Sequence, residues 1–117
     1  MRRIIICGDR NYDNWQNMIA VFDEHLDPKN DIIIEGGAWG ADLMAEAIGL
    51  NRGFDVEMFE ADWNTYGRAA GPIRNTEMIG SNIDTVFAFH KDITKSKGTK
   101  DTVKRAERSQ ITVHLVK

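Results

Sequence analysis

The sequence predicts an α/β protein, a Rossmann-like three-layer α/β/α sandwich built on a mostly parallel five-stranded sheet. Short aliphatic runs, typical of strands buried on both faces, alternate along the chain with segments whose apolar residues recur at helical spacing. Turns rich in glycine or polar residues separate these segments. The alternation indicates parallel strands joined by helices, and 117 residues without a linker or repeat indicate one domain over 1–117.

The first half of the chain is expected to alternate regularly between strand and helix. Residues 3–7 are a nearly continuous apolar run and predict a buried strand. Apolar residues three and four apart predict a helix over 14–25, which an Asp-Pro step ends. The aliphatic run 31–34 predicts a second strand, and the apolar pattern of 41–51 predicts a second helix.

In the second half, a third strand is expected over 54–59, followed by a loop over 60–71 that is rich in aromatic and small residues. Pro72 suits the first turn of a helix that runs to about residue 80. The apolar run 83–89 predicts the fourth strand. The rest of the chain predicts a loop, a helix and a strand, over 91–98, 99–109 and 111–116.

Ligands of such sheets bind beyond the carboxyl ends of the strands, where the strand order reverses. Four loops are expected to meet there, namely 8–11, 36–42, 62–74 and 90–99.

Composition excludes several classes of protein. The single cysteine, Cys7, excludes an internal disulfide framework, and no cluster of cysteine with histidine has zinc spacing. We therefore expect no metal, no cofactor and a cytoplasmic location. No apolar run is long enough to span a bilayer. The net charge of −3 argues against a protein that coats nucleic acid, although 91–108 holds seven basic residues against three acidic ones.

A glycine-rich segment over 35–42 follows the second strand and leads into the second helix. Gly36, Gly37, Ala38 and Gly40 are small enough to let the backbone approach a ligand, and the first amides of a helix attract anions. A phosphate site is one interpretation, and a turn that needs glycine only for packing is the other. The spacing matches neither the dinucleotide fingerprint nor the NTPase phosphate loop.

Three more residues at this edge have polar side chains that suit a nucleotide. Arg10 could grip phosphate or form a surface ion pair. Asp42 could accept hydrogen bonds from ribose hydroxyls or simply stabilise the dipole of its helix. Thr99, after Gly98, is expected to open the last helix, where it could cap the helix or bind phosphate.

The remaining candidates are equally open to two interpretations. Arg74 and Glu77 are three residues apart and could pair with each other or act in catalysis. Trp39 and Trp63 could stack on a base, or could close a core edge or a subunit interface. His90 ends the fourth strand and could be a general base, although no partner for it is apparent.

An ordered set of short motifs runs through almost the whole chain. They are Gly8-Asp9-Arg10, Gly36-Gly37-Ala38-x-Gly40-Ala41-Asp42, Ala61-Asp62-Trp63, Gly67, Ala70-Gly71-Pro72-x-Arg74-Asn75 and Gly98-Thr99. Together they resemble the YspA-like branch of the SLOG superfamily, whose small members occur in bacteria and phages. The resemblance implies a Rossmann-like domain that binds nucleotides or nucleotide-derived ligands. Its relatives include the lonely-guy phosphoribohydrolases and the DNA-processing protein DprA.

The phosphoribohydrolases pair an arginine in an Arg-Lys step with a glutamate in a Gly-Gly-x-Gly-Thr-x-x-Glu loop. Arg74-Asn75 falls on the first motif, and the segment that begins at Gly98 falls on the second. Thr102 stands at the glutamate position, and Lys95-Ser96 replaces the paired glycines. The resemblance therefore supports phosphate binding more than hydrolysis.

We therefore expect a module that senses or sequesters a nucleotide or a nucleotide-derived ligand, and that forms homo-oligomers. The alternative is an N-glycosidase of the phosphoribohydrolase type, with Arg74 and Glu77 or Asp42 as catalytic residues. DprA-like DNA binding is a third alternative, which the net charge disfavours, and no membrane partner is expected. The expected nucleotide-binding residues are Gly8, Arg10, Gly36, Gly37, Ala38, Gly40, Asp42, Trp63, Arg74, Asn75, Gly98 and Thr99.

Overall fold

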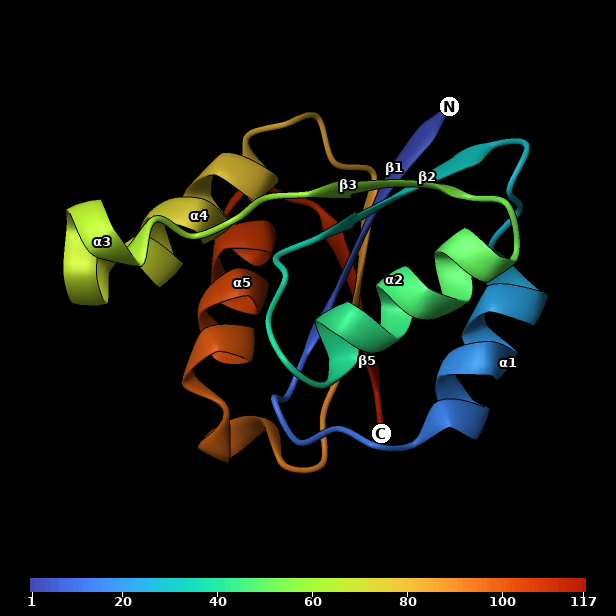
Figure 1. Cartoon of the computed structure of the whole chain (residues 1–117), viewed down its shortest axis with the longest axis horizontal. Coiled ribbons are helices and arrows are strands. Elements are labelled where there is room, and N and C mark those ends of the chain that lie inside the picture. Colours follow the sequence, from blue (N-terminus) through green and yellow to red (C-terminus); the bar gives the residue numbers. More distant parts are fainter.

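The computed structural model describes residues 1–117, which form one sheet between two helical layers (Figure 1). The strands are β1 (Arg2–Gly8), β2 (Asp31–Glu35), β3 (Asp55–Met58), β4 (Thr85–Phe89) and β5 (Thr112–Val116). The helices are α1 (Trp15–His25), α2 (Ala41–Asn51), α3 (Trp63–Tyr66), α4 (Ala70–Ile79) and α5 (Lys97–Arg108), with 3₁₀ turns at Gly67–Ala69 and Ile93–Lys95. Every pair of neighbouring strands is parallel. The predicted sandwich is confirmed, and its sheet is parallel throughout.

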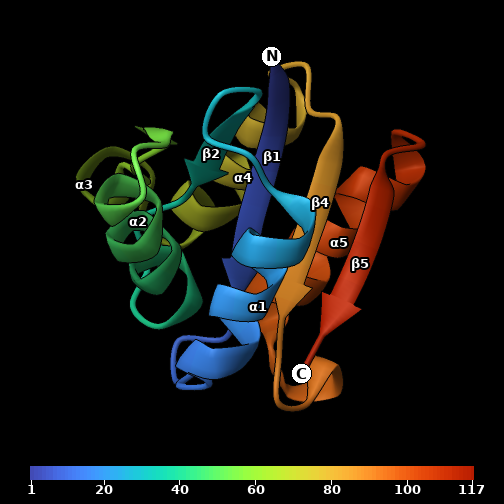
Figure 2. The same cartoon turned by 90° about the vertical axis from the view of Figure 1, so that its right-hand side faces the viewer.

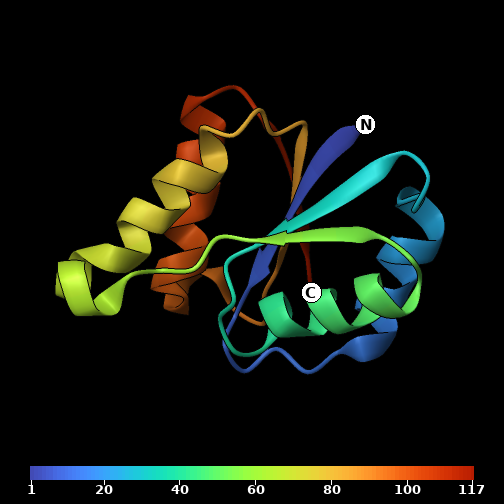
Figure 3. The same ribbon diagram turned by 45° about the horizontal axis from the view of Figure 1, so that its top comes forward.

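The central strand β1 divides its side chains between the two layers. Ile4 and Ile6 pack with residues of α1 and α2, whereas Ile5 and Cys7 pack with residues of α4 and α5. Figure 3 shows these two pairs of helices on opposite sides of the sheet. Because both faces are covered, alternate positions are all apolar, and each fully buried isoleucine stabilises the fold by about 1.5–3 kcal/mol.

The strand order β3-β2-β1-β4-β5 reverses direction at β1. The chain leaves β1 toward β2 and β3 on one side, and then returns to β4 on the other side. β1 and β4 therefore lie next to each other, as Figure 2 shows, while the loops that follow them lead in opposite directions. Such a point leaves space for a ligand beyond the carboxyl ends of the two strands.

The segment 60–71 is not the continuous loop that we predicted. It contains α3, which Asp62 caps by accepting a hydrogen bond from the Thr65 amide at 3.1 Å, and a 3₁₀ turn. Helix α4 then begins at Ala70. Pro72 lies in its first turn, where the missing amide hydrogen costs nothing. A helix as short as α3 has too few residues to show helical periodicity, so a loop prediction missed it.

Other boundaries shift by one or two residues. Helix α5 begins at Lys97, two residues before the predicted start at 99. Strands β3 and β4 are shorter than the predicted runs 54–59 and 83–89, because apolar residues continue past the ends of the strand pairing. No helix has both the length and the apolar character that are needed to cross a membrane.

Candidate functional site

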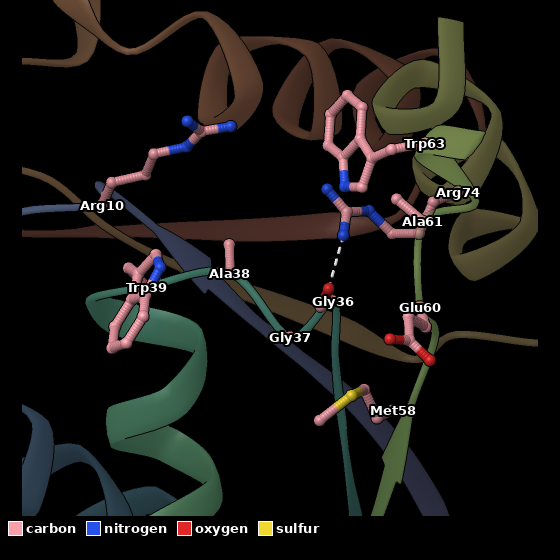
Figure 4. A pocket seen from close by; sticks show the side chains of 10 residues that line it. All are labelled: Arg10, Gly36, Gly37, Ala38, Trp39, Met58, Glu60, Ala61, Trp63 and Arg74. Carbon is pink, nitrogen blue, oxygen red and sulfur yellow. Dashed lines mark hydrogen bonds between the residues drawn. The ribbon is translucent and has the colours of Figure 1, made fainter. Parts of the chain in front are cut away.

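The four loops predicted to meet do come together, at the carboxyl ends of the strands, and they enclose two adjoining cavities. The first, of about 480 Å³, lies between the loop after β2 and the segment that leads into α3 (Figure 4). The second, of about 430 Å³, lies between that loop and the start of α5. Arg10, Ala38 and Arg74 line both cavities, so the two lie side by side.

Eleven of the twelve predicted nucleotide-binding residues line these cavities. The exception is Gly40, whose backbone lies tightly against the backbone of Asp9 and Arg10. Glu77 is not brought to the site, because its side chain is exposed on α4 and lines neither cavity. A catalytic role for Glu77 therefore has no support from its position.

The glycine loop is held by two buried carboxyl groups. Asp42 Oδ2 accepts hydrogen bonds from the amides of Gly36, at 3.0 Å, and Ala38, at 3.4 Å. Glu35 Oε1 accepts a hydrogen bond from the amide of Gly37. These three amides are already engaged, so the interpretation that they cradle a phosphate is wrong for this conformation. The sequence pattern could not show this, because a carboxylate of the protein takes the place of the expected anion.

Both carboxyl groups bind their protons more tightly than usual. Burial raises the pKa of Glu35 to about 7, although the hydrogen bond from Gly37 opposes the shift. Burial also raises the pKa of Asp42 to about 6, against the lowering effect of the Arg74 guanidinium and of the two amides. Both groups therefore have a pKa near neutral pH, and Asp42 lines the second cavity.

Two helices begin at the site without a side-chain cap. Neither Gly40, before α2, nor Ser96, before α5, caps its helix with a side chain. The Ser96 hydroxyl donates to Thr99 Oγ1 at 2.7 Å, and the amides of residues 97–99 donate to no acceptor of the chain. By contrast, Asn14 caps α1. Uncapped amides at a helix start attract anions.

The prediction that Thr99 opens the last helix is therefore wrong. Thr99 lies in the first turn of α5, and it is 3% exposed. Ser96 is the residue before α5. The 3₁₀ turn at Ile93–Lys95 ends next to Ser96, so the helix begins earlier than the sequence pattern indicated.

Arg74 is positioned by a chain of hydrogen bonds across two helices. Its Nη1 donates to the carbonyl oxygen of Gly36, and its Nε donates to Asn75 Oδ1 at 2.9 Å. Asn75 Nδ2 in turn donates to Asp101 Oδ2 at 3.0 Å, and Arg105 Nε donates to the same oxygen at 2.8 Å. Of the two interpretations of the Arg74 and Glu77 spacing, pairing with each other is not what the structure shows, because the guanidinium turns toward the glycine loop instead.

This chain of hydrogen bonds also changes the titration of Asp101. Burial alone would raise its pKa, but the hydrogen bonds from Arg105 and Asn75 outweigh burial and lower it. A carboxylate that stays ionised keeps the Asn75 amide oriented with its oxygen toward Arg74. Arg74 is therefore held at the junction of the two cavities before any ligand arrives.

Aromatic side chains flank the first cavity. Trp63 is 51% exposed and lies beside the Arg74 guanidinium, whereas Trp39 is 76% exposed and lies on the opposite side with Arg10 (Figure 4). Sequence reasoning missed Met58 and Glu60, which also line this cavity. Met58 is the last residue of β3 and Glu60 lies two residues beyond it, so the rule that ligands bind at the carboxyl ends of strands would have found them.

The histidines do not add catalytic groups to the site. His90 is buried, and its Nδ1 has no hydrogen-bond partner, but it lines neither cavity. The rings of His114 and His25 both lie near the Phe87 ring, with centroids 4.8 Å and 5.9 Å from it. No group of three or more histidine, cysteine or acidic side chains is arranged to hold a metal ion.

A parallel α/β sandwich with cavities at its strand-order reversal places the chain in the Rossmann-like class of proteins. The chain belongs to the YspA, cpYpsA-related SLOG family, whose model matches residues 2–66. It is also 35% identical to the gene 61 protein of Mycobacterium phage D29 over 123 aligned residues, which cover 97% of this chain and 94% of the phage protein.

Proposed function

We propose that the chain is a single nucleotide-binding domain that senses or sequesters a nucleotide or nucleotide-derived ligand in the cytoplasm. One observation carries the proposal. The uncapped start of α5 opens into a cavity that also contains the guanidinium groups of Arg10 and Arg74. Membership of the SLOG family supports the same class of ligand.

The phosphate is assigned to the start of α5, because the amides at 97–99 are free there and Lys95 and Lys97 line the same cavity. Arg10 makes no hydrogen bond within the chain and is available to a phosphate oxygen. The base is assigned to the first cavity, where Trp63 offers an indole face. Asp42 uses only Oδ2 for the glycine loop, which leaves Oδ1 for a ribose hydroxyl.

We expect nucleoside monophosphates to raise the melting temperature, and the matching nucleosides to have little effect. Ligand at a hundred times its dissociation constant stabilises a fold by about 2.7 kcal/mol, which differential scanning fluorimetry detects easily. Arg10→Ala should weaken nucleotide binding by about 1.5–3 kcal/mol without loss of stability, since Arg10 has no partner in the chain. Arg108→Ala, on the exposed far end of α5, is the control. Equal shifts from nucleosides and nucleotides would rule out phosphate as the main anchor.

An enzyme is the second candidate function, and the raised pKa of Asp42 beside Arg74 favours it. A carboxyl group that titrates near neutral pH suits acid catalysis of glycosidic cleavage. However, Thr102 stands at the glutamate position of the phosphoribohydrolases, and its hydroxyl donates to the Gly98 carbonyl oxygen at 3.3 Å. A hydroxyl does not supply the negative charge that stabilises an oxocarbenium-like ribosyl centre. We therefore favour binding without turnover.

The expected result is that no free base is released from AMP, CMP, GMP, UMP or their deoxy forms. The measurement is liquid chromatography after prolonged incubation with micromolar protein. Release of base in molar excess over protein, absent in Arg74→Ala, would refute the module and establish an enzyme. The second variant Asp42→Asn then shows whether Asp42 acts as the acid.

We also propose that the chain forms homo-oligomers. Met58, Trp63 and Tyr66 are large apolar residues that are 43–51% exposed, and α3 lies at one extreme end of the molecule (Figure 1). Burying such a surface against a second copy is favourable. Sedimentation velocity at micromolar concentration is expected to show a dimer or larger assembly that Trp63→Ser weakens. A monomer at every concentration would contradict this proposal.

A further inference from the structure

Glu60 is the only acidic residue that lines the first cavity. It is exposed, and its carboxylate forms no hydrogen bond and no ion pair within the chain. The other charged residues of this cavity, Arg10 and Arg74, also line the second cavity, whereas Glu60 does not. Glu60 therefore lies at the end of the site that is away from the assigned phosphate, with both carboxylate oxygens free.

The extended backbone after β3 directs the Glu60 side chain toward the cavity. The Phe59 amide donates to the Glu35 carbonyl oxygen at 2.9 Å, so the chain continues along β2 for one residue past Met58. Met58 packs on the glycine loop, because a Cβ atom at Gly37 would lie 2.9 Å from Met58 Sδ. Side chains two residues apart in an extended chain point to the same face. Glu60 therefore faces the cavity beside Met58, and Figure 4 shows the two side chains next to each other.

The surroundings of Glu60 limit what its carboxylate can bind. Arg10 and Arg74 disfavour a free cation, and the carboxylate itself repels phosphate. The ribose is assigned to Asp42, which lines the second cavity and not the first. The base is then the part of the ligand that reaches Glu60. An ionised carboxylate only accepts hydrogen bonds, so it requires a base edge that presents N–H donors.

Among the common bases, only guanine presents two neighbouring N–H donors. Its N1–H and its 2-amino group point the same way and match the two oxygens of one carboxylate. Adenine and cytosine each present an amino group beside a ring nitrogen that accepts, and uracil presents one N–H between two carbonyl oxygens. With any of these three bases, one carboxylate oxygen would face an acceptor, which is unfavourable.

We propose that the site selects guanine nucleotides, with Glu60 accepting hydrogen bonds from N1–H and from the 2-amino group of the base. Trp63, which lines the same cavity three residues further along the chain, then covers a face of that base. This inference rests on the proposed nucleotide-binding function and names the base for it.

Isothermal titration calorimetry of the whole chain with GMP, IMP, AMP, CMP and UMP tests the inference. GMP is expected to bind about ten- to a hundred-fold more tightly than AMP, CMP or UMP, the range for hydrogen bonds to a charged group. IMP keeps the N1–H group but lacks the 2-amino group. Its affinity is therefore expected to lie between those of GMP and AMP.

Glu60→Gln is expected to remove the preference for GMP. The side-chain amide of glutamine donates and accepts, so it matches the amino group and the ring nitrogen N1 of adenine. The variant should bind AMP at least as tightly as GMP, a reversal that a purely structural role of Glu60 would not produce. Glu57→Gln is the matched control on the same strand, because Glu57 pairs with Arg3 at 3.0 Å and does not line the cavity. The control should keep the order of affinities.

The outcomes separate this inference from the function on which it rests. Equal affinities for the five monophosphates, or a preference for another base, would overturn the selection of guanine and leave nucleotide binding intact. A preference for GMP that survives in folded Glu60→Gln would overturn the assignment to Glu60. Absence of binding by all five compounds would contradict the nucleotide-binding function, and this inference with it. The comparison of the five compounds on the unmodified chain does not depend on any variant folding.

Discussion

Replacing Gly40 with alanine is expected to destabilise the fold by at least about 3 kcal/mol and to abolish ligand binding. Gly40 has φ +80, a backbone conformation that costs other residues about 1–2 kcal/mol. A Cβ atom there would also lie 2.3 Å from Asp9 O and 2.5 Å from the carbonyl carbon and oxygen of Arg10. These are backbone atoms that cannot rotate away, so the loop after β1 must separate from the start of α2.

Substitutions at two other glycines separate the two causes of the stability lost in Gly40→Ala, namely the positive φ and the clash of the Cβ atom with the backbone. An alanine Cβ at Gly67, with φ +56, or at Gly98 would meet no atom within 4 Å. Gly67→Ala should therefore report the conformational cost alone, and Gly98→Ala, in the first turn of α5, should change stability by less than about 1 kcal/mol. Urea denaturation gives all three values. A Gly40→Ala protein as stable as the Gly67→Ala protein would show that the two loops are not tightly packed.

Glu35→Gln is expected to remove up to about 3 kcal/mol of pH dependence from the stability of the fold. The pKa of Glu35 is raised from 4.5 to about 7, so the folded chain holds this proton more tightly than the unfolded chain. Its contribution is therefore fully present below about pH 4.5 and is lost as the pH rises through about 7. Glutamine keeps an oxygen for the Gly37 amide but does not titrate, so the variant should be the more stable protein at pH 8.

Urea midpoints measured from pH 4 to pH 8 test this expectation. Asp42, with its pKa raised to about 6, adds a loss in the same direction, so some slope should remain in the variant. Glu107→Gln, at an exposed position on α5, should leave the original slope unchanged. Parallel curves for Glu35→Gln and the unmodified chain would show that Glu35 is ionised in the folded state at neutral pH.

Local patterns explain why so much of the site could be predicted. Gly8, Gly36 and Gly98 each stand near the junction of a strand or loop with the element that follows, and such junctions can be recognised from a few consecutive residues. Once parallel strands are inferred, their carboxyl ends must lie at one edge of the sheet, which brings Arg10 and Arg74 together across 64 residues. Nothing beyond that topology was needed to place them there.

The sequence predicted hydrogen-bond partners poorly, because each donor in the folded chain has several possible acceptors. The carboxyl groups of Asp42 and Glu77 are two examples. The sequence indicated Asp42 as a candidate ligand for ribose, but it did not show that Asp42 Oδ2 also accepts hydrogen bonds from two amides of the glycine loop. Glu77 was a candidate partner for Arg74, yet the guanidinium reaches the Gly36 carbonyl oxygen instead. Spacing along a helix shows which side chains are near each other, but not which competing partner lies nearer in the folded chain.

The sequence by itself determined the parallel α/β sandwich, the edge of the sheet that carries the site and the family. These features follow from strand and helix periodicity and from turn residues, which act over a few consecutive positions. Only the tertiary structure decided which amides remain free for an anion and which acids are buried. It also left Asp9 Oδ1 without a partner. Burial and hydrogen bonding depend on contacts between distant residues, such as Asp9 with Lys91 and Arg74 with Gly36, and no local pattern records them.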